Sequence, residues 1–117
     1  MNHPSHLLVL VGTDFSADAE NALATARDLV VRAPGAELHI VHVVAPIVGT
    51  VGISGIGPNL ATEVTEGLDR ARSQLQRVCR AGDALASRTT AHLRSGDAAS
   101  EITRLAESLG ADLIVVG

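Results

Sequence analysis

The sequence predicts an α/β fold with a doubly wound parallel sheet, Rossmann-like in architecture. Two observations lead to this prediction. Short runs of β-forming apolar residues alternate with segments in which apolar residues recur at helical spacing, in the order β-α-β-loop-α-β-α-β. Several of these runs are apolar without interruption, which is typical of parallel strands buried on both faces. Such a sheet carries helices on both faces and binds ligands beyond the carboxyl ends of its strands.

The first predicted strand is Leu-Leu-Val-Leu-Val at residues 7–11, and the turn 12–16 comes directly after it. Ser16 is suited to cap a helix, and acidic residues then fall in the first turn, where the helix dipole is positive. The helix is expected to stop at Pro34-Gly35. Its predicted buried face consists of Ala19, Ala22, Leu23, Ala26, Leu29 and Val30.

Residues 38–44 form the second predicted strand, and residues 47–59 are too rich in glycine for regular structure. We interpret this segment as a mobile loop or a lid near the site. The next helix has the most regular apolar spacing of the chain, with a basic and acidic face that we expect to be solvated. Its predicted stripe runs through Val64, Leu68, Ala71, Leu75, Val78, Gly82 and Leu85.

Residues 88–94 form a more polar strand, which is typical of the edge of a sheet. Asp97 is predicted to cap the last helix and Gly110 to end it. The buried stripe of this helix is predicted to be Ile102, Leu105, Ala106 and Leu109. Residues 112–117 form the last strand. Because this strand is very apolar, we expect residues 1–117 to be a single domain truncated at its C-terminus, with about 25 further residues in a helix and a strand.

The composition excludes several classes of function. All nine cationic residues are Arg, so a Walker A lysine and a Schiff-base lysine are excluded. One Phe with no Trp or Tyr offers no stacking platform for nucleic acid, and the net charge of −4 argues against a phosphate-backbone binder. The single cysteine predicts a reducing, cytoplasmic setting. No targeting or membrane-spanning segment is expected.

No catalytic or metal site is predicted. The chain has no G-x-S-x-G nucleophile elbow and no evident carboxylate pair, so an enzymatic role is not favoured. His39 and His42 are three residues apart on a strand, so they point to opposite faces and cannot chelate one metal ion. We interpret His42 as a buried histidine whose ring is satisfied by a hydrogen bond, and Cys79 as a core or boundary residue.

Three segments resemble the universal stress protein family. They are LLVLVGTDFSADAENALATARDLV, ELHIVHVVAP and SGDAASEITRLAESLGADLIVVG, in this order along the chain. The resemblance implies a five-stranded parallel sheet of order 3-2-1-4-5, so that this chain has the order 3-2-1-4 and lacks the fifth strand. It also implies binding of ATP or AMP, with or without Mg²⁺, in stress response, a homodimer, and at most slow ATP hydrolysis.

The resemblance also implies which residues bind the nucleotide. Asp14 matches the aspartate at the adenine, Val43 matches a backbone contact to adenine, and Gly117 matches the first glycine of the family's G-x2-G-x9-G-[ST] phosphate motif. Asp14 is alternatively a turn aspartate, and the glycines are alternatively turn glycines. The predicted site residues are Gly12, Thr13, Asp14, Val43, Gly96 and Gly117.

Two other functions remain open at this stage. The same fold can serve as a dimeric interaction module that binds no nucleotide. An adenylating enzyme is less favoured, because the turn after the first strand, GTDFS, lacks the glycines of a phosphate loop.

Overall fold

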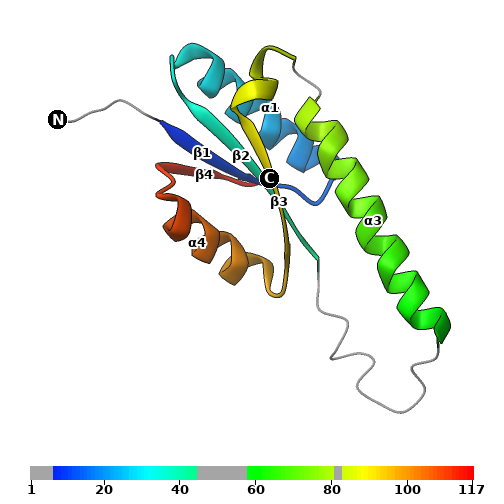
Figure 1. Ribbon diagram of the computed structural model, residues 1–117. Helices are drawn as coiled ribbons and strands as arrows, with labels where there is room; N and C mark the ends of the chain where they lie inside the picture. Colours follow the sequence, from blue (N-terminus) through cyan, green and yellow to red (C-terminus); the bar gives the residue numbers. More distant parts are fainter. Residues whose placement is uncertain (1–6, 45–57, 81–82) are drawn as a thin grey trace.

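A computed structural model describes residues 7–44, 58–80 and 83–117 of the chain (Figure 1). The elements succeed one another in the predicted alternation of strands and helices. They are β1 (Leu8–Gly12), α1 (Ala17–Arg32), β2 (Glu37–Val44), α3 (Pro58–Arg80), the 3₁₀ helix η1 (Asp83–Arg88), β3 (Thr89–Ser95), α4 (Ala98–Leu109) and β4 (Leu113–Val115).

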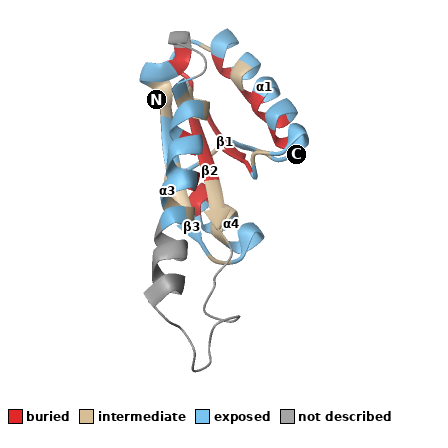
Figure 2. Cartoon of the chain, turned by 90° about the vertical axis from the view of Figure 1, so that its right-hand side faces the viewer, coloured by how far each residue is buried: buried red, intermediate tan, exposed pale blue. Residues whose placement is uncertain are grey.

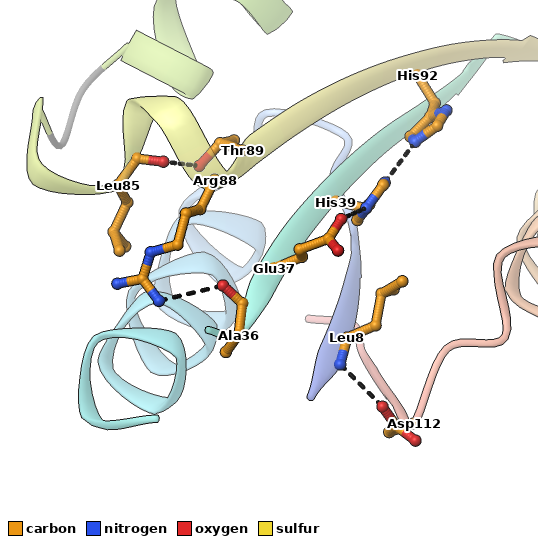
Figure 3. Close-up of polar contacts among 9 residues, drawn as sticks. All are labelled: Leu8, Ala36, Glu37, His39, Leu85, Arg88, Thr89, His92 and Asp112. Atoms are coloured by element: carbon orange, nitrogen blue, oxygen red, sulfur yellow. Dashed lines mark hydrogen bonds and ion pairs between the residues drawn. The ribbon is translucent and has the colours of Figure 1, made fainter. Parts of the chain in front are cut away.

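The four strands form one parallel sheet in the order β3-β2-β1-β4. This confirms the predicted fold class, strand order and edge position of β3. Two hydrogen bonds join the starts of β1 and β4. The backbone N–H of Leu8 donates to Oδ2 of Asp112 at 2.8 Å (Figure 3). The N–H of Asp112 donates to the backbone oxygen of Leu8 at 2.9 Å.

The sheet is covered on both faces, and its two central strands are the most buried part of the molecule (Figures 1 and 2). α1 and α3 pack on one face, where alternate residues of β1 and β2 form the larger core with Leu23, Val30 and Leu75. α4 packs on the other face, where Leu10 and Val41 contact Leu105 and Ala106. Because side chains alternate along a strand, each strand contributes to both cores.

The predicted helix ends are confirmed. The hydroxyl of Ser16 accepts from the N–H of Ala19 at 3.2 Å, and the carboxylate of Asp97 accepts from the N–H of Ser100 at 3.0 Å. Gly110 ends α4 with φ +71°, a conformation that costs glycine least.

Four expectations need correction. α3 begins at Pro58, inside the predicted loop, and proline is well suited to the first position of a helix. Leu85 is buried, but it lies on η1 and not on the preceding helix. Leu29 is 37% exposed, because the buried stripe of α1 continues from Ala26 to Val30 at a spacing of four. β4 is three residues long, half the predicted length.

Some expectations fall outside the described residues. These are the loop over residues 47–57, the side chain of Val64, and Gly82. Cys79 is half-buried against the larger core, as expected. Its raised pKa is due to burial, which disfavours the thiolate.

Candidate functional site

A cavity of about 270 Å³ lies at the carboxyl ends of β1 and β2, between the starts of α1 and α4. This is where a parallel α/β sheet with helices on both faces binds its ligands. The residues that line the cavity come from both strands, both helices and the chain after β4. They are Gly12, Thr13, Asp14, Ala19, Val41, Val43, Ala98, Ile102, Val116 and Gly117.

Asp14 presents the carboxylate of the cavity. Its Oδ1 accepts a hydrogen bond from the backbone N–H of Ser16 at 2.9 Å. This contact with Ser16 lowers the pKa of Asp14, with a smaller contribution from the charge of His42. The side chain is exposed, so the carboxylate is ionised at neutral pH and can only accept hydrogen bonds.

Phe15 holds the turn between β1 and α1 in an unusual backbone conformation. Its φ is +66°, which is in the left-handed region and strained for a bulky side chain. The N–H of Phe15 donates to Oγ1 of Thr13 at 3.0 Å, and its ring packs on that of His42 with centroids 4.4 Å apart. These contacts offset the strain and stabilise the turn that carries Asp14.

His42 supports the same turn from β2. Its Nδ1 lies 2.7 Å from the backbone oxygen of Thr13. A carbonyl oxygen only accepts, so Nδ1 carries the proton. The prediction of a satisfied ring is confirmed, but the ring is half-buried and not buried. The buried histidine of the described chain is His39, at 6% exposure.

The first turns of two helices meet at the cavity. Ala98 is the first residue of α4, and Ala19 lies in the first turn of α1. The N-terminus of a helix carries a partial positive charge and N–H groups without a partner in the helix. The two helix starts therefore bring backbone N–H donors to the cavity without any lysine. Ser16 and Asp97 already accept from two of these groups, the N–H of Ala19 and the N–H of Ser100.

Two glycines allow the walls of the cavity to approach closely. A Cβ atom at Gly12 would lie 2.9 Å from Cδ1 of Ile102. A Cβ atom at Gly117 would lie 2.5 Å from the backbone oxygen of Asp18, in the first turn of α1. Glycine is required at position 117 in this arrangement, because a Cβ atom there would meet backbone. At position 12 a Cβ atom would only require the end of the Ile102 side chain to move aside.

The structure brings five of the six predicted site residues together around the cavity: Gly12, Thr13, Asp14, Val43 and Gly117. Gly96 does not line it. Its N–H donates to the oxygen of Val44 at 3.0 Å, and its φ of +139° is accessible mainly to glycine. Gly96 thus ties the end of β3 to β2.

Five other lining residues were not predicted as site residues from the sequence: Ala19, Val41, Ala98, Ile102 and Val116. Two patterns could have indicated part of this set. Val41 and Val43 share a face of β2 by the period of two, and Ala98 and Ile102 share a face of α4 by the spacing of four. Val116 and Ala19 meet the others only through tertiary packing.

Over residues 7–44, 58–80 and 83–117, no group of three side chains is placed to hold a metal ion. No helix in the described part of the chain is long and apolar enough to cross a membrane.

The sequence and the fold match known proteins. The sequence profile of the universal stress protein family matches residues 8–117. No curated protein sequence matches the chain significantly.

Three solved structures share the fold. A universal stress family protein from Burkholderia pseudomallei is 24% identical, with a TM-score of 0.77 over 99% of this chain and 84% of its own. UspA from Lactobacillus plantarum is 23% identical, with a TM-score of 0.65 over 98% and 79%. A universal stress protein in complex with cAMP is 24% identical, with a TM-score of 0.70 over 97% and 77%. Because the family profile matches residues 8–117, this chain belongs to the universal stress protein family.

Proposed function

We propose that this chain binds an adenine nucleotide, ATP or AMP, in the cavity at the carboxyl ends of β1 and β2. The observation that carries the proposal is the composition of the cavity wall. One carboxylate, Asp14, stands with Thr13 at a wall that is mainly apolar, and the first turns of α1 and α4 meet beside it. A mainly apolar wall, a hydrogen-bond acceptor and the N-termini of two helices together suit a flat base linked to an anion.

The base would lie against the apolar part of the wall. Val41, Val43, Ile102 and Val116 supply aliphatic side chains there. The ionised carboxylate of Asp14 accepts hydrogen bonds, so it suits the exocyclic amine of adenine and disfavours the carbonyl oxygen that guanine carries at the same ring position. The backbone of Val43 is at the end of β2, within the same wall.

The phosphates would lie toward the starts of α1 and α4. Helix N-termini bind anions through backbone N–H groups, which explains how a chain of net charge −4 with no Lys can hold a nucleotide. Gly117 lies against the first turn of α1, so the backbone at Gly117 and the N-terminus of α1 are close enough to bind the same anion. Mg²⁺ would be held by the phosphates, since no described cluster of side chains is built for it.

The comparisons support an adenine ligand. A relative of the same fold has been solved in complex with cAMP, which contains adenine, ribose and phosphate. The cavity, at about 270 Å³, is slightly smaller than the usual small-molecule pocket, for which the range begins at about 300 Å³.

The test is a titration of the full chain with AMP and with IMP, in which a carbonyl replaces the 6-amine of the ring and the neighbouring nitrogen N1 gains a proton. Isothermal calorimetry should give a lower Kd for AMP. The substitution Asp14→Ala should raise the Kd for AMP by about tenfold and remove most of the preference, since a hydrogen bond to a charged group is lost.

Asp28→Ala is the matched control. It removes the same charge from an exposed side chain at the far end of α1, where Asp28 pairs with Arg32 at 3.1 Å. Its Kd for AMP should equal that of the unmodified chain. An equal Kd for AMP and IMP, or an unchanged Kd in Asp14→Ala, would exclude the assignment of Asp14. No binding of ATP or AMP at all would exclude the proposed function.

A further inference from the structure

Two histidines on neighbouring strands share a hydrogen bond away from the cavity. Nδ1 of His39 in β2 lies 2.8 Å from Nε2 of His92 in β3, and the rings are nearly parallel with centroids 5.1 Å apart. Nε2 of His39 lies 3.1 Å from Oε1 of Glu37. Figure 3 shows the three side chains in a row along the two strands.

The geometry fixes where protons can lie. A carboxylate accepts hydrogen bonds, so Nε2 of His39 carries a proton toward Glu37. Only one proton fits between Nδ1 of His39 and Nε2 of His92. The other nitrogen of His92 can be protonated or free. The hydrogen-bonded pair of rings therefore holds at most one positive charge. A second positive charge would require a proton on both facing nitrogens, and the two N–H groups would then oppose each other at 2.8 Å.

We propose that His39 and His92 form a proton-sensing pair, which accepts one proton with the β2–β3 edge intact and loosens that edge when both rings are protonated. The pair stands on the outermost pairing of the described sheet, where β3 has β2 as its neighbour. The pairing of β3 with β2 can therefore loosen on protonation while the central strands stay folded. The proposal does not depend on nucleotide binding.

The charges around the pair support this. Burial lowers the pKa of His92 most, and the charges of His39 and Arg94 lower it further. Glu37 faces His39 from the same strand. α4, which packs on this face, contacts the sheet through apolar residues, and its Arg104 and Glu101 pair with each other at 3.1 Å.

A loosened β3 would also act on the next helix of the chain. β3 leads through Gly96 into α4, and the N–H of Gly96 bonds to the oxygen of Val44. Ala98, the first residue of α4, lines the cavity. A change at the pair can therefore reach the cavity wall through one short turn.

The sign of the pH effect is given by proton counting. A histidine in an unfolded chain titrates near pH 6.5. Below this pH the unfolded chain binds two protons at these positions and the folded pair binds one. Stability therefore falls as the pH falls, and the equilibrium constant for unfolding should rise by up to about tenfold per pH unit.

The experiment is urea unfolding of the full chain, monitored by circular dichroism from pH 7.5 to 5. His92→Gln is the informative variant, because the amide can donate to His39 but cannot titrate. It should flatten the pH dependence by about half or more. His42→Asn is the comparison variant, since it removes a histidine from the same strand and leaves the pair in place, and its slope should stay steeper than that of His92→Gln.

Nuclear magnetic resonance of the unmodified chain gives an independent readout, which does not require any variant to fold. Imidazole ¹⁵N shifts should show two separate protonation steps for the pair, and the second step should coincide with faster amide exchange in β3. Overlapping, independent titrations of the two rings with constant protection of β3 would overturn the proposal. An unchanged pH slope in a folded His92→Gln would do the same.

Discussion

Nδ1 of His42 donates a hydrogen bond to the backbone oxygen of Thr13, 2.7 Å away, and so joins β2 to the turn that carries Asp14. The N–H of Thr13 in turn donates to the oxygen of Val41 at 2.9 Å. Both the N–H and the C=O of Thr13 are thus hydrogen-bonded to β2, and these two bonds hold the turn in place. Thr13 is itself buried, so its carbonyl would have little access to water without His42.

Removal of this donor should destabilise the fold by a measurable amount. His42→Ala leaves the buried oxygen of Thr13 without a partner, whereas His42→Asn keeps a donor at a similar distance from the backbone. Both variants lose the ring. We expect His42→Asn to be more stable than His42→Ala by about 1 kcal/mol in urea unfolding. Equal stabilities would show that water or a rearranged turn satisfies the oxygen.

The strain at Phe15 can be measured with a pair of substitutions that both remove the ring. Phe15→Gly removes the cost of the left-handed backbone, and Phe15→Ala keeps it. We expect Phe15→Gly to be the more stable of the two by about 1 kcal/mol in thermal or urea unfolding. A more stable Phe15→Ala would indicate that the turn does not keep φ +66° without the ring.

The contact between Gly12 and Ile102 should behave as a coupled pair. Gly12→Ala places a Cβ atom 2.9 Å from Cδ1 of Ile102, so the end of that side chain must shift and the substitution should destabilise the chain by about 1 kcal/mol through overpacking. Ile102→Val removes Cδ1 and makes room. In a double-mutant cycle measured by urea unfolding, the double variant should recover about 1 kcal/mol of the sum of the single effects. Strict additivity would show that the two residues do not compete for this space.

The start of α4 should depend on pH through Asp97. Hydrogen bonds from Ser100 lower the pKa of Asp97 below its ordinary value of 3.8. A lowered pKa in the folded state means that this cap stabilises the fold above pH 3.8 and that its contribution is lost as the pH falls through the folded pKa.

The matched variant is Asp97→Asn, which keeps an oxygen at the cap but does not titrate. Amide exchange of the first turn of α4, measured at several pH values between 6 and 3, should show a smaller loss of protection on acidification in Asp97→Asn than in the unmodified chain. The same loss in both proteins would assign the acid sensitivity of α4 to another group.

Local rules predicted much of this fold. The caps at Ser16 and Asp97 and the helix end at Gly110 are consequences of residue type and position, and each has the expected geometry. The polar composition of β3 predicted its edge position, since a strand with one neighbour tolerates polar side chains. Asp14, Val43 and Gly117 were predicted at the site by resemblance, and they line one cavity.

Other features depend on contacts between distant residues. The hydrogen bond between His39 and His92 joins side chains 53 residues apart, and no local pattern indicates it. The left-handed backbone of Phe15 contradicts the preference of its residue type and requires support from His42 and Thr13. Leu85 continues the spacing of α3 but lies on the separate 3₁₀ helix η1. The apolar spacing did not predict this break, because spacing alone does not mark where a helix ends.

By itself, the sequence determined the class of fold, the order of its elements, the absence of lysine chemistry and the end of the strands, the carboxyl end, at which a site should lie. These properties follow from periodicity, composition and chain direction, which can be read without knowing how distant residues pack. Only the tertiary structure decided which side chains share the cavity, which histidine is buried and which proton positions the paired rings allow. Those properties depend on distances of a few ångströms between residues far apart in the chain, and packing sets those distances.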